Sequence, residues 1–121
     1  MIQLLLHLLG DYFIQNDWMA LNKKKKSWTG ELACQVHCIT YALPFLLIAS
    51  WEAVILIYLT HYLFDRTNIV AWIIAIKNGQ RSIKNFGFHK DRPFAITIWL
   101  LIIADNSIHI AINYFLISLL P

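Results

Sequence analysis

The stretch His7-Leu8-Leu9-Gly10-Asp11-Tyr12-Phe13-Ile14-Gln15 places an imidazole, a carboxylate and a carboxamide four residues apart within an apolar segment. Residues four apart lie on one face of a helix, with about 5–6 Å between their Cβ atoms. The spacing therefore predicts a helix with one polar stripe. Two later segments repeat the pattern, the first with His61 and Asp65 and the second with Asp105, His109 and Asn113. Together the stripes predict helices that meet around a shared polar centre.

The composition is typical of a membrane protein. Hydrophobic residues make up 59% of the 121 residues and charged residues 14%, whereas roughly a quarter of a soluble domain is charged. The net charge of +3 could indicate a nucleic-acid partner, but nine of the ten Lys and Arg residues fall in two clusters, Lys23–Lys26 and 77–92, beside long apolar runs. Such clusters favour anionic lipid headgroups as the partner, and no nucleic acid is expected.

Four apolar segments are long enough to cross a bilayer. They predict an all-α, polytopic membrane protein in which residues 1–121 form a single transmembrane domain, a four-helix bundle with spans at about 2–21, 28–50, 52–74 and 93–119. The stretch 76–92 is expected to form a basic interfacial loop or a short amphipathic helix. The loops after the first and third spans carry the basic clusters, which places both loops in the cytoplasm of a bacterial cell and both termini on the opposite side of its inner membrane.

Local signals mark the second span. Ser27 or Thr29 is suited to cap the start of a helix. Pro44 lies well inside the apolar run, where it removes a backbone donor and is expected to kink the helix. Only residues 49–51 remain for a turn before the third span, so the second and third spans should form a tight helical hairpin.

The two cysteines, Cys34 and Cys38, are four residues apart in this second span. The spacing puts both sulfurs on one helix face, where a disulfide would be strained because one helical turn is at the edge of disulfide geometry. We expect two reduced thiols that pack as small apolar side chains.

The polar groups of the stripes are expected to lie at a common depth. At about 1.5 Å per residue, most of them fall roughly 14–20 Å below the outer ends of their spans, and His7 about 8 Å below. An isolated carboxylate there costs at least about 2.5–3.5 kcal/mol, so the aspartates need a cation or shared protons. One reading is a set of hydrogen bonds that fasten helices together, at about 0.6–2 kcal/mol each.

The other reading, which we favour, is a divalent-metal site, with zinc as the first choice and manganese or iron as alternatives. The expected ligands are His7, Asp11, His61, Asp65, Asp105 and His109. Asp11 or Asp65 could instead act as a general base toward a water molecule. The residues expected to support the ligands or contact substrate are Gln15, His37, Arg66 and Asn113. His37 could equally be a packed core histidine, and Arg66 could hold a phosphate or extend to the cytoplasmic interface.

The chain resembles a family of small bacterial and phage inner-membrane proteins of unknown function. The resemblance is carried by His7-x-x-Gly10-Asp11-Tyr12-x-x-Gln15-x-Asp17-Trp18-Met19-Ala20 before the lysines, then His37, His61-x-x-x-Asp65-Arg66 and Asp105-x-x-x-His109. It implies a shared architecture and no particular activity. More distantly, the pattern is similar to proteins described as metal-dependent hydrolases of the LexA-binding inner-membrane type, and this resemblance implies hydrolysis at a metal.

Three functions are compatible with these features. The leading hypothesis is a metal-dependent hydrolase that acts on a lipid or a lipid-linked phosphate, with Asp11 or Asp65 as the catalytic carboxylate. The alternative is an oligomeric proton or ion conductor that uses the same histidines and aspartates. A third possibility is a phage-type effector that binds a host membrane protein. The chain has no P-loop or dinucleotide fingerprint, so nucleotide chemistry is not expected.

Overall fold

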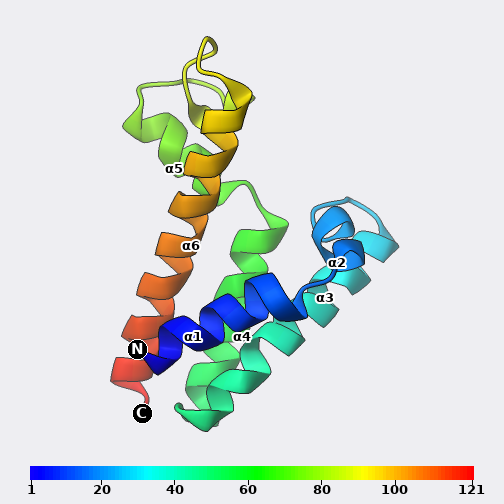
Figure 1. The fold of residues 1–121 in the computed structure, drawn as a ribbon, viewed down its shortest axis with the longest axis vertical. Helices are drawn as coiled ribbons and strands as arrows, with labels where there is room; N and C mark the ends of the chain where they lie inside the picture. Colours follow the sequence, from blue (N-terminus) through cyan, green and yellow to red (C-terminus); the bar gives the residue numbers. More distant parts are fainter. The chain divides into compact units, whose positions relative to one another are not determined.

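The computed structural model describes residues 1–121, and every element in it is helical, which confirms the all-α prediction (Figure 1). In chain order the elements are α1 (Ile2–Leu8), the π-helical turn η1 (Leu9–Ile14), α2 (Asp17–Asn22), α3 (Trp28–Ala42), the 3-10 helix η2 (Leu43–Leu47), α4 (Trp51–Arg66), α5 (Ile69–Lys77), the short turn η3 (Lys84–Gly87) and α6 (Phe94–Leu119). They form two compact units. Unit 1 contains residues 1–67 and 109–121, and unit 2 contains residues 68–108.

The first predicted span is interrupted. Helix α1 widens into η1, and the backbone is then extended at Gln15 and Asn16 before α2 begins. The break has a local cause, because the Asn16 side chain accepts a hydrogen bond from the backbone N–H of Met19 at 2.9 Å and so caps α2. The polar pair at 15–16 therefore ends one helix and starts another, where hydropathy alone predicted a continuous helix to residue 21.

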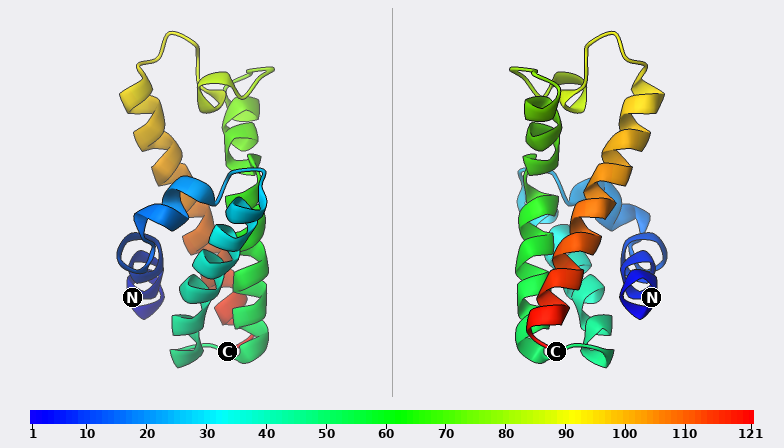
Figure 2. Two further views of the ribbon diagram at one scale, coloured as in Figure 1. Left: turned by 90° about the vertical axis from the view of Figure 1, so that its right-hand side faces the viewer. Right: turned by 90° about the vertical axis from the view of Figure 1, so that its left-hand side faces the viewer.

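Helices α3 and α4 form the predicted hairpin and lie side by side (Figures 1 and 2). The Ser27 hydroxyl accepts the Gly30 N–H at 3.1 Å, so Ser27 is the cap of α3. The α-helix ends at Ala42, and the residues around Pro44 continue as the narrower η2, which agrees with the expected effect of the proline. After a three-residue turn, Ser50 caps α4 by accepting the Ala53 N–H at 3.3 Å.

The core of unit 1 lies between this hairpin and α1, which runs across the pair (Figure 1). Tyr41, Phe45 and Ile57 are fully buried, and the other buried members of the core are Leu6, Ala42 and Val54. Gly10 permits the close approach of the first segment, because a Cβ at Gly10 would overlap the Tyr41 ring. The C-terminal part of α6 completes unit 1 by packing Leu116 and Ile117 against this core.

The third predicted span, 52–74, is also interrupted. Helix α4 ends at Arg66, Thr67 is extended, and α5 starts at Ile69. The Arg66 guanidinium is held by backbone carbonyls of the lysine-rich loop, at Lys23 and Lys25, rather than following the helix axis. The structure therefore does not support four continuous membrane-spanning helices.

Helix α6 agrees closely with the fourth predicted span, 93–119. It is the one helix in the chain that is both long enough and apolar enough to cross a membrane. Its start follows Pro93, whose carbonyl accepts hydrogen bonds from two backbone N–H groups of the first turn, those of Ile96 and Thr97. Proline at this position costs no hydrogen bond, since the first N–H groups of a helix have no partner within it.

Unit 2 packs the turn η3 against α5. Gly87 has a φ of +83°, and a Cβ there would overlap backbone atoms of Ala71 and Ala75, so only glycine fits. The Asn85 side chain donates to the carbonyls of His89 and Arg92 at 2.9 and 3.1 Å. The predicted interfacial stretch 76–92 is thus a folded loop pinned to α5 and contains no amphipathic α-helix.

Candidate metal centre

Two buried histidines face each other across the α3–α4 hairpin. His37 projects from α3 and His61 from α4, both are at most 1% exposed, and their Nε2 atoms are 3.0 Å apart. Two nitrogen lone pairs at this distance repel each other, so one Nε2 must donate a hydrogen to the other or a cation must lie between them. The pair can therefore form a neutral hydrogen bond or bind a cation.

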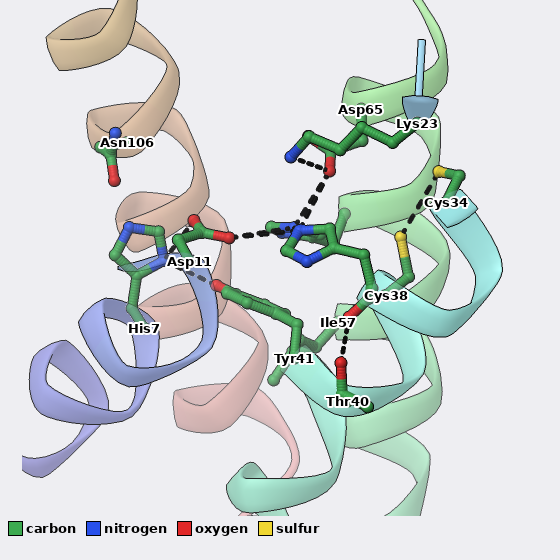
Figure 3. A network of polar contacts seen from close by, with 12 residues as sticks. His7, Asp11, Lys23, Cys34, Cys38, Thr40, Tyr41, Ile57, Asp65 and Asn106 are labelled. Atoms are coloured by element: carbon green, nitrogen blue, oxygen red, sulfur yellow. Dashed lines mark hydrogen bonds and ion pairs between the residues drawn. The ribbon is translucent and has the colours of Figure 1, made fainter. Parts of the chain in front are cut away.

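The Asp11 carboxylate, labelled in Figure 3, lies close to both imidazoles. Its Oδ1 atom is 3.3 Å from His37 Nε2 and 3.5 Å from His61 Nε2. Asp11 sits in the π-helical turn η1, whose wider ring is closed by the Gln15 N–H bonding to the Gly10 carbonyl at 3.2 Å. π-Helical turns of this kind occur often at functional sites.

The Asp65 carboxylate also approaches the pair and has a further partner. Its Oδ2 atom is 3.2 Å from His37 Nε2 and 3.5 Å from His61 Nε2, and it accepts a hydrogen bond from Lys23 Nζ at 2.7 Å. Asp65 is 3% exposed. A carboxylate buried to this extent needs compensation, and the Lys23 ammonium supplies it.

The distances within the Asp11 group match those around a metal ion. Ligand atoms at about 2.0–2.1 Å from a tetrahedral zinc lie about 3.3–3.4 Å apart. The three atoms Asp11 Oδ1, His37 Nε2 and His61 Nε2 are separated by 3.0 to 3.5 Å. The buried Oδ1 has no hydrogen-bond partner despite these short distances, as expected where lone pairs converge on a common point. The buried histidine and aspartate groups could therefore hold a metal ion.

Tyr41 contacts the site by packing its ring against the His61 ring. The two rings are stacked, with centroids 3.7 Å apart. The Tyr41 hydroxyl accepts a hydrogen bond from Asn113 Nδ2 at 2.6 Å and forms another with His7 Nδ1 at 2.7 Å. His7 Nδ1 is in turn 3.6 Å from Asp11 Oδ2. These contacts orient His61 and Asp11 together.

The other residues predicted for the site take different places. His109 is buried in unit 1 with its ring centroid 4.2 Å from that of His61. Asp105 belongs to unit 2, where it is partly buried on α6. Gln15 follows the π-helical turn and has a buried Oε1 without a hydrogen-bond partner. The assignment of His7, His109 and Asp105 as ligands stays a prediction.

Arg66, predicted either to hold a phosphate or to extend to the interface, is engaged within the protein. It donates to the carbonyls of Lys23 and Lys25, both at 2.9 Å, and lies 3.3 Å from a carboxylate oxygen of Glu31. These contacts fix the lysine-rich loop against the end of α4. Arg66 thereby places Lys23 beside Asp65.

Two residues of the site were not predicted from the sequence. Lys23 belongs to the lysine cluster expected to contact anionic lipid, and nothing local distinguishes it from its neighbours, because its partner is 42 residues away. Tyr41 carried a usable signal, since it follows His37 by four residues and so shares its helix face.

Comparison with known proteins shows the family of the chain. No curated protein and no solved structure matches it. One family profile matches residues 1–119, which includes every residue of the site described above. The chain belongs to the family described as "Protein of unknown function (DUF3307)".

Proposed function

We propose that this protein is a metal-dependent hydrolase of the bacterial inner membrane that acts on a lipid or a lipid-linked phosphate. The observation that carries the proposal is the group formed by Asp11, His37 and His61, whose three ligand atoms lie 3.0 to 3.5 Å apart in a buried site.

The ligand set is of the catalytic kind. Two imidazoles and one carboxylate leave one position of a tetrahedral ion open, whereas structural zinc sites fill all four. A divalent ion held there, zinc first, would polarise a phosphoryl oxygen and lower the pKa of a water molecule. Asp11 fits the role of ligand because its inward oxygen has no competing hydrogen-bond donor.

Asp65 fits the role of general base. It approaches the same imidazoles at 3.2 and 3.5 Å, and the Lys23 ammonium stabilises its ionised form. An ionised carboxylate at this place is positioned to take a proton from an attacking water, and the lysine contact that keeps it ionised also lowers its basicity. Lys23, positioned by Arg66, also brings positive charge to where a phosphate would arrive.

A membrane location is supported by the exposed surface of the helices. Large apolar side chains are exposed along several of them, among them Leu5, Leu47, Leu59, Trp99 and Phe115. Soluble monomers rarely expose apolar surface on this scale. We place the site near the cytoplasmic side of the bilayer, with Lys23 turned inward to Asp65. The other basic residues of the clusters 23–26 and 77–92 lie at the cytoplasmic headgroups, where lysine and arginine contact anionic lipid.

The decisive experiment uses the full chain purified in detergent without chelator. We expect at least one zinc ion per chain by elemental analysis, and hydrolysis of phosphatidic acid or a polyprenyl phosphate presented in micelles. His37→Ala should lose both the ion and the activity. Thr60→Ala is the matched control, because Thr60 donates only to carbonyls of its own helix, at Leu56 and Ile57.

Two results would contradict the proposal. One is wild-type protein that contains no stoichiometric metal and takes none up when zinc is supplied. The other is hydrolysis that His37→Ala leaves at the wild-type rate.

A second function, proton conduction, is favoured by a separate observation. Polar contacts of 2.7 to 3.6 Å link the titratable groups Tyr41, His7, Asp11, His37, Asp65 and Lys23 in an unbroken series. Such chains of titratable groups carry protons in membrane proteins. In metal-free protein reconstituted into liposomes, a pH-driven flux abolished by Asp11→Asn would favour conduction over hydrolysis.

A further inference from the structure

The two cysteines form a second group of metal-binding atoms beside the first. Cys34 and Cys38 are reduced and fully buried on α3, with their Sγ atoms 3.8 Å apart (Figure 3). Both cysteines lie on the helix that carries His37, and His37 directly precedes Cys38 in the chain. The proposed hydrolase makes no use of them.

The separation of the sulfurs suits a shared ion. A disulfide needs an S–S distance of about 2.05 Å, which side chains one helical turn apart reach only with strain. Two thiolates on a tetrahedral zinc ion, with Zn–S bonds of about 2.3 Å, lie about 3.8 Å apart. The thiols therefore already have the spacing of a bidentate pair of ligands.

A third ligand lies within reach of Cys38. Cys38 Sγ, a ring nitrogen of His61 and a carboxylate oxygen of Asp65 all lie within 4.8 Å of one another, and all three residues are buried. Asp65 has two carboxylate oxygens, so one can bind this ion while the other accepts the proton in the proposed hydrolase. His61 is already assigned to the first ion through Nε2, which leaves Asp65 as the third ligand for the second.

We propose that Cys34, Cys38 and Asp65 bind a second, thiophilic divalent ion next to the ion held by Asp11, His37 and His61. Thiolate ligands select zinc, cadmium or cobalt over magnesium or calcium. Binding converts two thiols to thiolates and releases two protons, so a divalent ion and two thiolates add no net charge to the buried site. The charge balance set by Lys23 and Asp65 is thereby preserved.

The test is a titration of the full-length protein in detergent with Co²⁺. Thiolate ligation gives a sulfur-to-cobalt charge-transfer absorption that imidazole and carboxylate ligands do not give. We expect two equivalents of Co²⁺ to bind and the charge-transfer band to develop with one of them. Wild-type protein titrated with Cd²⁺ should give the corresponding sulfur-to-cadmium band, and this measurement needs no variant.

Variants separate the two ions. Cys34→Ser and Cys38→Ser should each abolish the charge-transfer band and lower the bound cobalt from two equivalents to one. His37→Ala should also remove one equivalent but retain the band. Thr40→Ala on the same helix is the matched control, since its hydroxyl donates only to the Val36 and His37 carbonyls.

The proposal is overturned if saturating Co²⁺ and Cd²⁺ give no charge-transfer band with wild-type protein, or if the band persists in Cys38→Ser. A single equivalent bound without the band would refute the cysteine site and leave the proposed hydrolase intact. The cysteine site and the proposed hydrolase therefore fail in different ways.

Discussion

The two carboxylates that approach the imidazole pair differ in what else they touch. Asp11 comes from a π-helical turn, and its inward oxygen has no hydrogen-bond donor. Asp65 comes from a regular α-helix, and its Oδ2 atom accepts a hydrogen bond from the Lys23 ammonium at 2.7 Å. Both lie at similar distances from the same two nitrogens. The two carboxylates therefore lie equally close to the imidazoles but differ in their other partners. We assign them different roles, Asp11 as a metal ligand and Asp65 as a proton acceptor.

The largest expected effect tests this division directly. Asp65→Asn should lower the hydrolysis rate by about 10²–10⁴-fold, because an amide cannot accept the proton. The variant should keep the ion held by Asp11, His37 and His61, measured as bound Co²⁺ that gives no sulfur-to-cobalt absorption. Asp11→Asn is the comparison, and it should lose that ion together with the activity. If both variants keep the ion and lose activity equally, the two sides do not differ as described.

The next effect concerns the Lys23 contact, which only the Asp65 side has. Lys23→Met should destabilise the protein by about 3 kcal/mol, because it leaves a buried carboxylate without its counter-charge. This value is at the lower end of the destabilisation expected when one partner of a buried ion pair is removed, because the Lys23 side chain is 15% exposed. The midpoint of thermal unfolding in detergent measures the loss.

Lys24→Met is the matched control in the same lysine run. Its exposed ammonium donates to the Thr67 carbonyl at 3.3 Å, so its effect should stay within about 0.5 kcal/mol. Equal stabilities of the Lys23 and Lys24 variants would show that the buried ion pair contributes nothing.

The smallest expected effect is on the contacts that serve the Asp11 side. Tyr41→Phe keeps the ring stacked on His61 but removes the hydrogen bonds to His7 and Asn113. We expect a loss of about 1–2 kcal/mol in stability and about a tenfold weaker zinc affinity, measured by competition with a chromogenic chelator. Tyr114→Phe, at an exposed tyrosine of α6, should change neither quantity. An unchanged affinity in Tyr41→Phe would make the tyrosine a packing residue only.

Local spacing in the sequence predicted part of the site. The four-residue intervals placed His7 with Asp11 and His61 with Asp65, and each pair is in contact in the structure. These contacts follow from helix geometry within one segment, which a sequence displays directly. The same rule applied to His37 would have included Tyr41.

Contacts between segments could not be predicted in the same way. The pairing of Lys23 with Asp65 depends on a helix break at residues 15–16 and on Arg66 anchoring the lysine loop. Hydropathy averages over a window and is insensitive to a single capping asparagine, so it extended the first helix past the break. The helix ends, and with them the position of the loop, are set by individual side-chain hydrogen bonds.

The π-helical turn at Leu9–Ile14 has a consequence for how this segment tolerates change in length. Its hydrogen-bonded rings hold one residue more than those of an α-helix. Removing one residue would let the turn close into a regular α-helical ring while the residues before and after it stay nearly in phase. Asp11 lies inside the turn, so its direction relative to those flanking residues would change. A single-residue deletion within the turn is therefore expected to move the Asp11 carboxylate away from the imidazole pair.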